Sequence, residues 1–414
     1  MKLGTFGRKV NLGVIGLGHR GYEQMKLLAS MEDVVIKAIS DNYPDRVQRA
    51  LDHLKQVGRP APFASESADD VLNRKDIEAV VIMTSWETHF PLAIKAIKNG
   101  IKPALEVGGS SSVQECWDLV NASETYQVPV MMLENCCYGE EELTLLNMVR
   151  QGVFGELVHV RGAYEHDLRE EVGKGDIIRH YRQHHFLTRN AELYPTHELG
   201  PIARYLDINY GNRMLYLTSM SSKAAGLSAW MKEHRQDKPE LANHQVNQGD
   251  VVVTQIMCAN GETIVLTHDC TLPRPYSRGG RIQGTKGIWM EDNRSIYIDG
   301  RSPVNPDHWT HEWEKDTAYM EEYRSDLWKD YLDFGTRGGH GGMDYLVFRA
   351  FIEAIQQGTA FPIDVYDTVT WRVITTLSEQ SIAMGSLPVA IPDFTNGKWL
   401  TRRDEAVGEY KLGR

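Results

Sequence analysis

Cysteine is scarce in this sequence of 414 residues. The chain has five, an odd number with no C-x-x-C pair, at Cys116, Cys136, Cys137, Cys258 and Cys270. This count and spacing argue against a disulfide framework and against the usual cysteine metal sites. We therefore expect reduced, mostly buried thiols.

An excess of positive charge and long apolar runs are also absent from the sequence. Lys and Arg total 45 against 56 Asp and Glu, for a net charge of -11, and no basic tract is present. This balance makes a nucleic-acid partner unlikely on electrostatic grounds. No apolar run approaches the ~20 residues that span a bilayer, and the N-terminus M-K-L-G-T-F-G-R-K-V lacks the apolar core of a secretory signal. We expect no membrane partner and a cytoplasmic location.

The first third of the chain alternates short apolar runs with amphipathic stretches. The runs cover residues 10–16, 34–40, 79–84, 103–107 and 128–134, and helical patterns include 91–99 and 112–126. Apolar runs of this length are typical of parallel strands buried on both faces. The pattern predicts an α/β fold with a parallel sheet.

The rest of the chain has a different pattern. Alternating segments at 156–164, 214–220, 251–258, 263–269 and 295–299 predict strands of a mostly antiparallel open sheet, and 197–209, 342–357 and 366–384 predict helices. We expect two domains, residues 1–135 and an α+β domain at 136–414. The exposed face of such a sheet favours a homo-oligomer, either a dimer or a tetramer.

A glycine motif follows the first predicted strand. Gly16, Gly18 and Gly21 form G-L-G-H-R-G where a helix should begin, and the second predicted strand ends at Asp41, 20 residues after Gly21. This arrangement is the fingerprint of a Rossmann dinucleotide-binding domain, with the acidic residue on the ribose hydroxyls. Because Asp41 repels a 2′-phosphate and Asn42 has no charge to hold one, NAD is favoured over NADP.

The segment T-S-W-E-T-H-F-P follows the third long buried run, at the sheet edge where such folds bind ligands. Trp86 and His89 are therefore candidates for lining the cofactor. The alternative for His89 is a cap for a helix that Pro91 opens.

Together, G-L-G-H-R-G, Asp41, T-S-W-E-T-H and E-V-G-G resemble the Gfo/Idh/MocA superfamily of NAD(P)-dependent sugar oxidoreductases. Longer motifs at 131–138, 148–159, 163–169, 193–201 and 274–281 resemble glycoside hydrolase family 109, the NAD-dependent glycosidases associated with α-N-acetylgalactosaminidase activity. The resemblance covers nearly the whole chain.

This resemblance implies roles for matching positions. The residues implied to line NAD are Gly16, Gly18, His19, Arg20, Gly21, Asp41, Trp86, His89, Glu106, Val107, Asn135 and Tyr194. Those implied to contact a small-molecule glycoside are Tyr164, Arg182, Tyr194, Pro195, Thr196, His197 and Tyr276. No metal site is expected.

The segment Glu106, Val107, Gly108 departs from the superfamily, whose dehydrogenases usually read E-K-P there. Valine replaces their lysine, which is consistent with acid/base work elsewhere in the site. Gly108 replaces a frequent proline, which leaves the local backbone conformation open.

The implied chemistry is transient oxidation of sugar C3 by NAD⁺, deprotonation at C2, elimination of the aglycone, addition of water and re-reduction. NAD-dependent glycosidases are exceptions to the usual two-carboxylate mechanism. We expect Tyr194 and His197 to form the acid/base centre, with Tyr164 the other proton-transfer candidate and Arg182 a possible stabiliser of a phenolate. Which residue acts at C2 and which at O3 stays open.

Other histidines and aromatics have simpler interpretations. His184 and His185 are adjacent and would point apart on a helix, and strand neighbours such as His166 with Asp167, or His268 with Asp269, face opposite ways. Tyr276 can be an amphipathic packing residue with a wet hydroxyl. His340, between glycines, either approaches substrate or is an ordinary loop residue.

Two other functions remain open at this stage. The chain could be a sugar dehydrogenase that releases NADH, or a sensor that binds sugar and NAD without turnover. Accumulation of NADH separates the first from a redox-neutral glycosidase, and binding without product identifies the second.

Overall fold

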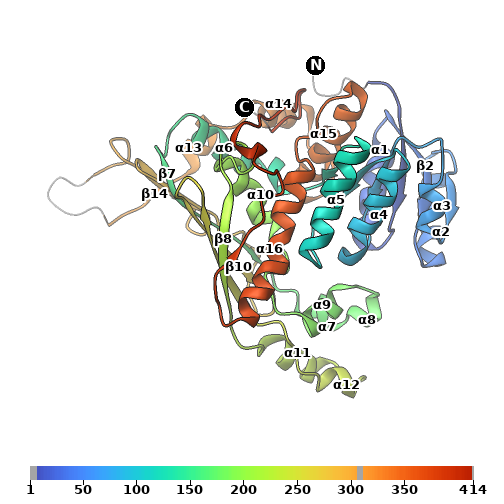
Figure 1. The fold of residues 1–414 in the computed structure, drawn as a ribbon, viewed down its shortest axis with the longest axis horizontal. Coiled ribbons are helices and arrows are strands. Elements are labelled where there is room, and N and C mark those ends of the chain that lie inside the picture. The colour runs from blue at the N-terminus through green and yellow to red at the C-terminus, as the bar shows by residue number, and fades with distance from the viewer. Residues whose placement is uncertain (1–6, 305–310, 413–414) are drawn as a thin grey trace. The chain divides into compact units, whose positions relative to one another are not determined.

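The computed structural model describes residues 7–304 and 311–412. The chain divides into two compact units, which Figure 1 shows in ribbon form. Of the described residues, unit 1 contains 7–139, 326–370 and 403–412, and unit 2 contains 140–304, 311–325 and 371–402. The first boundary lies close to the predicted one at 135/136, but two later segments assigned by the sequence to the second domain pack with unit 1.

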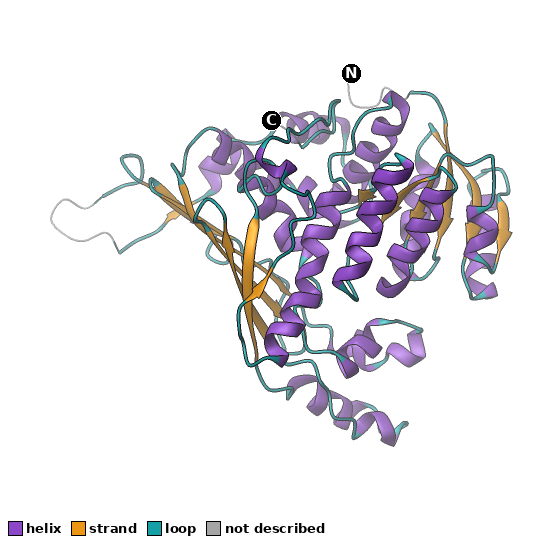
Figure 2. Cartoon of the chain, viewed as in Figure 1, coloured by secondary structure: helices purple, strands orange, loops and turns teal. Residues whose placement is uncertain are grey.

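Unit 1 is built on a six-stranded, fully parallel sheet with the order β3-β2-β1-β4-β5-β6. Its strands are β1 (Val10–Ile15), β2 (Val34–Ser40), β3 (Phe63–Ser65), β4 (Ala79–Ile82), β5 (Lys102–Leu105) and β6 (Met131–Met132). This sheet confirms the predicted Rossmann domain, and Figure 2 shows its strands in orange among the helices.

The crossover helices of unit 1 follow the strands in turn. They are α1 (His19–Ser30), α2 (Pro44–Gln56), α3 (Ala68–Leu72), α4 (Trp86–Lys98) and α5 (Val113–Tyr126), followed by the 3₁₀ turn η1 (Asn135–Tyr138). The helix α5 begins with a capping box, in which Ser112 and Glu115 exchange bonds with each other's backbone N–H groups.

The later segments of unit 1 form α14 (Asp326–Phe334), the short turn η2 (His340–Gly342) and α15 (Met343–Gln357). Residues 344–355 of α15 are all buried, so this helix is covered on every side. Arg349 of α15 donates to both oxygens of Asp33 at 2.7 and 2.9 Å. This packing explains why a segment 200 residues beyond the Rossmann sequence belongs to the same unit.

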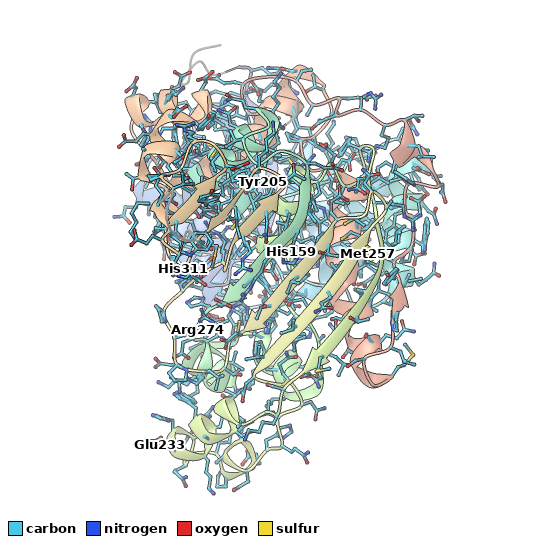
Figure 3. All side chains as sticks on the ribbon, turned by 90° about the vertical axis from the view of Figure 1, so that its left-hand side faces the viewer. His159, Tyr205, Glu233, Met257, Arg274 and His311 are labelled. Atoms are coloured by element: carbon cyan, nitrogen blue, oxygen red, sulfur yellow. The ribbon has the colours of Figure 1, made fainter. Side chains whose placement is uncertain are left out.

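Unit 2 is built on a nine-stranded sheet with the order β14-β13-β12-β11-β7-β10-β9-β8-β15. Its strands are β7 (Leu157–Glu165), β8 (Met214–Ser221), β9 (Val251–Cys258), β10 (Thr263–Asp269), β11 (Arg281–Gly284), β12 (Gly287–Met290), β13 (Ser295–Ile298), β14 (Glu314–Lys315) and β15 (Val389–Ala390). Within the described part of this sheet only β7 and β10 pair in parallel, so the predicted mostly antiparallel sheet is confirmed. Figure 3 looks onto this sheet, with His159 on β7 and Met257 on β9.

The helices of unit 2 lie mainly before and between these strands. They are α6 (Glu140–Arg150), α7 (Arg169–Gly173), α8 (Gly175–Ile178), α9 (Arg182–Thr188), α10 (Thr196–Tyr205), α11 (Gly226–His234), α12 (Pro239–Ala242) and α13 (Thr317–Glu322), with η3 (Lys398–Leu400) near the end. The helix α16 (Val365–Ala383) begins in unit 1 and ends in unit 2. No helix in the described part of the chain has the length and apolarity to cross a membrane.

The helix α10 packs directly on β7, and Gly162 makes the close approach possible. A Cβ atom on Gly162 would lie 2.6 Å from the Cβ atom of Glu198, which is closer than real Cβ contacts. The first turn of α10 is therefore held against the end of β7. That contact places the Y-P-T-H segment beside Tyr164.

Candidate functional site

The glycine motif of unit 1 has the shape that a dinucleotide requires. Gly16 has a φ of +92°, and a Cβ atom there would lie 2.5 Å from the carbonyl oxygen of Met83. A Cβ atom on Gly21 would lie 2.0 Å from the carbonyl oxygen of Gly16, so this position also has no room for a side chain. A Cβ atom on Gly18 would have its nearest neighbour at 3.5 Å. This leaves an open surface at the start of α1, where a pyrophosphate meets the helix N-terminus.

Asp41 is held at the end of β2 by the backbone. Its carboxylate accepts the N–H of Leu17 at 2.7 Å and the N–H of Tyr43 at 3.0 Å. The Nη1 atom of Arg46 lies 3.6 Å from Oδ2 of the same carboxylate, and no sequence motif had indicated this cation. Asp41 therefore neutralises a guanidinium that would otherwise be available to a 2′-phosphate.

We expect Asp41→Ser to shift cofactor preference toward NADP. Removing the carboxylate both relieves its repulsion of a 2′-phosphate and frees Arg46 to bind one, so the ratio of the NADP to the NAD dissociation constant should fall by about tenfold or more. Titration calorimetry with each nucleotide measures this ratio. Adding Arg46→Ala to Asp41→Ser should return this ratio most of the way to its wild-type value. An unchanged NADP affinity in Asp41→Ser would contradict the prediction.

The helix α4 begins at Trp86 and not at Pro91, so the interpretation of His89 as a cap for a helix opened by Pro91 is wrong. His89 lies inside the first turns, is fully buried, and its Nε2 is 2.9 Å from the carbonyl oxygen of Thr84. This bond holds the strand-to-helix turn. A role for His89 in lining the cofactor stays a prediction.

Trp86 explains why glycine occupies position 108. Gly108 has a φ of +149°, and a Cβ atom there would overlap the indole ring of Trp86. Val107 beside it is buried, with 3% of its surface exposed, and its N–H donates to the carboxylate of Glu106 at 3.0 Å. The segment 106–108 is therefore packed against an aromatic ring and contains no cationic residue of its own.

The polar residues predicted to line NAD meet in unit 1. Arg20 donates from Nε to Glu106 at 2.9 Å, while His19 beside it is exposed. Asn135 is 2% exposed, and its Oδ1 has no hydrogen-bond partner among the described residues. A buried acceptor without a partner, next to an open glycine cradle, fits a bound ligand with N–H or O–H donors such as NAD.

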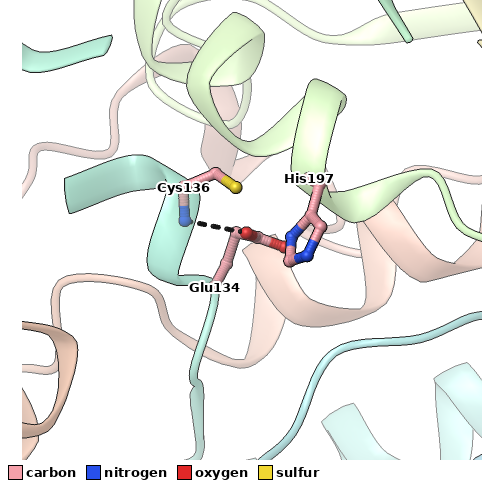
Figure 4. Close-up of side chains that lie close together, drawn as sticks. All are labelled: Glu134, Cys136 and His197. Carbon is pink, nitrogen blue, oxygen red and sulfur yellow. Dashed lines mark hydrogen bonds between the residues drawn. The ribbon is translucent and has the colours of Figure 1, made fainter. Parts of the chain in front are cut away.

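Glu134 is a buried carboxylate that the sequence analysis did not single out. It follows β6 directly, is fully buried, and accepts the backbone N–H of Cys136 at 3.0 Å (Figure 4). Its signal in the sequence was the position directly after a buried strand, whereas Asn135 was indicated by the family resemblance.

In unit 2 the three predicted proton-transfer residues form one cluster. The ring centroids of Tyr164 and Tyr194 are 4.5 Å apart, those of Tyr194 and His197 are 4.9 Å apart, and those of Tyr164 and His197 are 5.7 Å apart. Tyr164 and Tyr194 are 6% and 7% exposed. Pro195 precedes the first turn of α10 and Thr196 opens it, and both are buried.

Arg182 supplies the positive charge of this cluster. Its guanidinium lies 4.9 Å from the ring centroid of Tyr194 and donates to Glu171 at 3.0 Å. Arg182 lowers the pKa of Tyr164, but burial acts more strongly and raises that pKa to about 12. Tyr164 therefore keeps its proton at neutral pH, which differs from the expectation of a stabilised phenolate.

His166 lies beside Tyr164, directly after the end of β7. Its Nδ1 is 3.4 Å from the Tyr164 hydroxyl, and burial followed by the charge of Arg182 lowers its pKa. Its ring is 5.3 Å from that of Tyr276, whose side chain is 47% exposed. The spacing of Tyr164 and His166, two residues apart at a strand end, was the available signal for this pair.

The other histidines are less accessible or lie elsewhere. Burial lowers the pKa of His268 to about 3, so this ring is neutral behind Tyr164. On α9, His185 is buried and His184 is exposed, so the two point apart as expected. His340 is in unit 1, where its Nδ1 lies 2.9 Å from the carboxylate of Asp344.

A small cavity that is partly open to solvent adjoins His197 in unit 2. It lies between α10, α6 and the sheet strands, and its walls include Glu142, Arg278 and Trp289. Through His197 this space adjoins the aromatic cluster, and it gives water a place beside that ring.

The family of the chain follows from its similarity to known proteins. Residues 138–401 match the family described as Glycosyl hydrolase 109, C-terminal domain, and residues 10–134 match the Oxidoreductase family, NAD-binding Rossmann fold. A glycosyl hydrolase family 109 protein of Stenotrophomonas maltophilia is 42% identical over 96% of this chain and 91% of that protein. A Tannerella forsythia protein named alpha-N-acetylgalactosaminidase is 37% identical over 95% of this chain and 88% of that protein.

Solved structures share the fold at low identity. Levoglucosan dehydrogenase in complex with NADH and L-sorbose has a TM-score of 0.68 and 18% identity, over 94% of this chain and all of that one. Scyllo-inositol dehydrogenase from Lactobacillus casei, with bound NAD(H) and scyllo-inositol, has a TM-score of 0.64 and 12% identity, over 93% and 99% of the chains. The chain belongs to glycosyl hydrolase family 109 and is an NAD-dependent glycosidase with the Gfo/Idh/MocA fold.

Proposed function

We propose that this enzyme hydrolyses terminal α-linked N-acetylgalactosamine, or a closely related hexoside, by a redox-neutral cycle. The observation that carries the proposal is the packing of Tyr164, Tyr194 and His197 around one point beside Arg182. The name of the 37% identical Tannerella forsythia relative supports the choice of sugar.

NAD held by the glycine loop, Asp41 and the Asn135 region would accept a hydride from C3 of the sugar and return it at the end. The chain must then supply a base for the C3 hydroxyl, a base for C2 and stabilisation of the enolate oxygen. We assign the acid/base work to Tyr194 and His197, without deciding between C2 and O3. Arg182 faces both tyrosine rings and stabilises negative charge that develops between them.

Tyr164 has a different role in this proposal. Burial raises the pKa of Tyr164 to about 12, so its hydroxyl stays protonated at neutral pH and can donate a hydrogen bond to the sugar or to the neutral ring of His166 beside it. Tyr276, at the exposed side of these rings, would contact the sugar. Water for the final addition would enter through the cavity beside His197.

The test is proton NMR in D₂O with α-linked nitrophenyl N-acetylgalactosamine, with and without added NAD⁺, while aglycone and NADH are followed. Free sugar carrying deuterium at C2, without stoichiometric NADH, supports the cycle. Accumulation of NADH with the aglycone still attached would identify a dehydrogenase. Binding without any product would identify a sensor.

We also propose that the chain forms a dimer or tetramer through the outer face of the unit 2 sheet. Tyr216 and Met220 on β8 are 42% and 66% exposed, and both pair with β9 residues on that face. A lysine at this face would bury a charge in the contact.

We expect Met220→Lys to lower the mass measured by light scattering at a fixed protein concentration. Ile177→Lys on α8, where the native side chain is 60% exposed, is the matched control and should leave the mass unchanged. An unchanged mass in Met220→Lys would exclude this face as the contact.

The cytoplasmic location also stays a proposal. It is supported by the five cysteines, which are all buried and form no disulfide with one another.

A further inference from the structure

Asp344 at the start of α15 is the common acceptor of a buried polar cluster in unit 1. Its side chain is 1% exposed. Arg20 donates to both of its oxygens at 2.7 and 2.9 Å, Gln24 donates at 2.9 Å, and Asn135 donates at 2.8 Å. His340 lies 2.9 Å from the same carboxylate.

Two of these donors, Arg20 and Asn135, are residues predicted to line NAD. A third residue predicted to line NAD, Glu106, is connected to Asp344 through Arg20. Arg20 belongs to the glycine loop after β1, and Asn135 follows β6. Arg20 also donates to Glu106, which follows β5, so one guanidinium joins two carboxylates. Asp344 thus ties together the carboxyl ends of three strands, the edge of the sheet at which such folds bind their ligands.

The charge of Asp344 determines how Asn135 is oriented. Hydrogen bonds from His340 and Arg20 hold the pKa of Asp344 far below its ordinary value despite burial, so the carboxylate is ionised and can only accept. Asn135 must therefore turn its NH₂ group toward Asp344. Its Oδ1, which has no partner among the described residues, is left to accept from a ligand.

We propose that Asp344 is a positioning residue for the NAD site. It fixes the amide of Asn135 with its oxygen toward the cofactor and holds Arg20 against Glu106. An asparagine at position 344 would keep the shape, but its amide can donate as well as accept. The orientation of Asn135 and the ion pair of Arg20 would then both be lost.

The test measures the NAD⁺ dissociation constant by titration calorimetry, after bound nucleotide has been removed by dialysis against charcoal. We expect Asp344→Asn to raise this constant by about tenfold or more, because a charge-assisted bond and an oriented acceptor are lost. The measurement concerns binding alone, so it does not depend on the glycosidase cycle.

The matched control is Asp33→Asn. Asp33 is also 1% exposed and accepts an arginine of the same helix, Arg349, but it precedes β2 and so lies at the opposite edge of the sheet. Both variants should unfold at lower temperature, while Asp33→Asn should keep the wild-type dissociation constant. Equal dissociation constants in the two variants would overturn the proposal.

A second variant keeps the proposal testable if Asp344→Asn cannot be purified. Asn135→Leu leaves the Arg20–Asp344 ion pair in place and removes the oriented acceptor together with the bond from Asn135 to Asp344. We expect an increase of about tenfold in the NAD⁺ dissociation constant, as for the loss of one buried hydrogen bond. Wild-type affinity in Asn135→Leu would show that the orientation set by Asp344 has no effect on the cofactor.

Discussion

Tyr194→Phe is expected to lower kcat for α-linked nitrophenyl N-acetylgalactosamine by about 10²–10⁴-fold, the usual contribution of a positioned acid/base group. The substitution removes one hydroxyl. It keeps the ring that packs 4.5 Å from Tyr164 and lies under the guanidinium of Arg182. The loss should therefore appear in kcat, with the fold and the thermal unfolding temperature nearly unchanged.

Tyr205→Phe is the matched control for this substitution. Tyr205 ends the same helix α10 and is also buried, and its hydroxyl donates to the carbonyl of Glu142 at 3.4 Å. Loss of this hydroxyl should leave kcat within about threefold of wild type, since a buried hydroxyl bonded to a backbone carbonyl contributes mainly to stability. Activity above a tenth of wild type in Tyr194→Phe would remove Tyr194 from the acid/base centre.

The same variant distinguishes the two possible roles of Tyr194. A rise of NADH absorbance in a single turnover, without release of aglycone, would place its hydroxyl at C2. No NADH at all would place it at O3. His197→Ala should then fail at the other step, and the double variant should be little worse than either single one, because the two groups act as a unit.

The sequence predicted the Rossmann unit well because its strands are buried on both faces and therefore read as continuous apolar runs. It missed β3, β11, β12, β14 and β15, which are two to four residues long and too short to show a period. The placement of α15 in unit 1 could not be predicted. Its contacts with Asp33 and Arg20 join residues more than 300 positions apart.

The family resemblance predicted the members of the aromatic cluster, but the electrostatics of the cluster needed the fold. Local signals supported that prediction, because Y-P-T-H lies at the start of a helix and Tyr164 lies at the end of a strand. Whether Arg182 or burial controls the pKa of Tyr164 depends on how much of the ring is covered. Burial is stronger here, and only three-dimensional packing shows that.

Glu192 illustrates the same limit, because no motif indicates it. This residue lies two positions before Tyr194 and is fully buried. Its Oε1 accepts the N–H of Tyr194 at 3.3 Å, and its Oε2 has no partner among the described residues. Burial raises the pKa of Glu192 from 4.5 to about 8, so the carboxyl group is neutral at pH 7.

Glu192→Gln is expected to remove a pH dependence of stability. In the wild type the folded state holds this proton up to about pH 8, whereas the unfolded chain releases it near 4.5. The stabilisation is therefore complete below 4.5 and is lost as the pH rises toward 8, by about 1.4 kcal/mol per pH unit. Glutamine is neutral at every pH and has no such slope.

Urea unfolding at pH 5, 7 and 9 measures this difference. Glu192→Gln should lie within about 1 kcal/mol of wild type at pH 5 and be more stable by about 2–4 kcal/mol at pH 9. A difference that does not vary with pH would show that Glu192 is ionised in the folded state.

Cys270→Ser is the control for the neighbouring buried group. Burial raises the pKa of Cys270 well above its ordinary value, and Glu192 adds to that rise. The folded thiol therefore keeps its proton throughout this pH range. A thiol of the unfolded chain releases its proton only from about pH 8.5, so Cys270 adds no slope between pH 5 and 7. If Cys270→Ser keeps the wild-type slope between pH 5 and 7 while Glu192→Gln loses it, the proton held next to Tyr194 belongs to the carboxyl group.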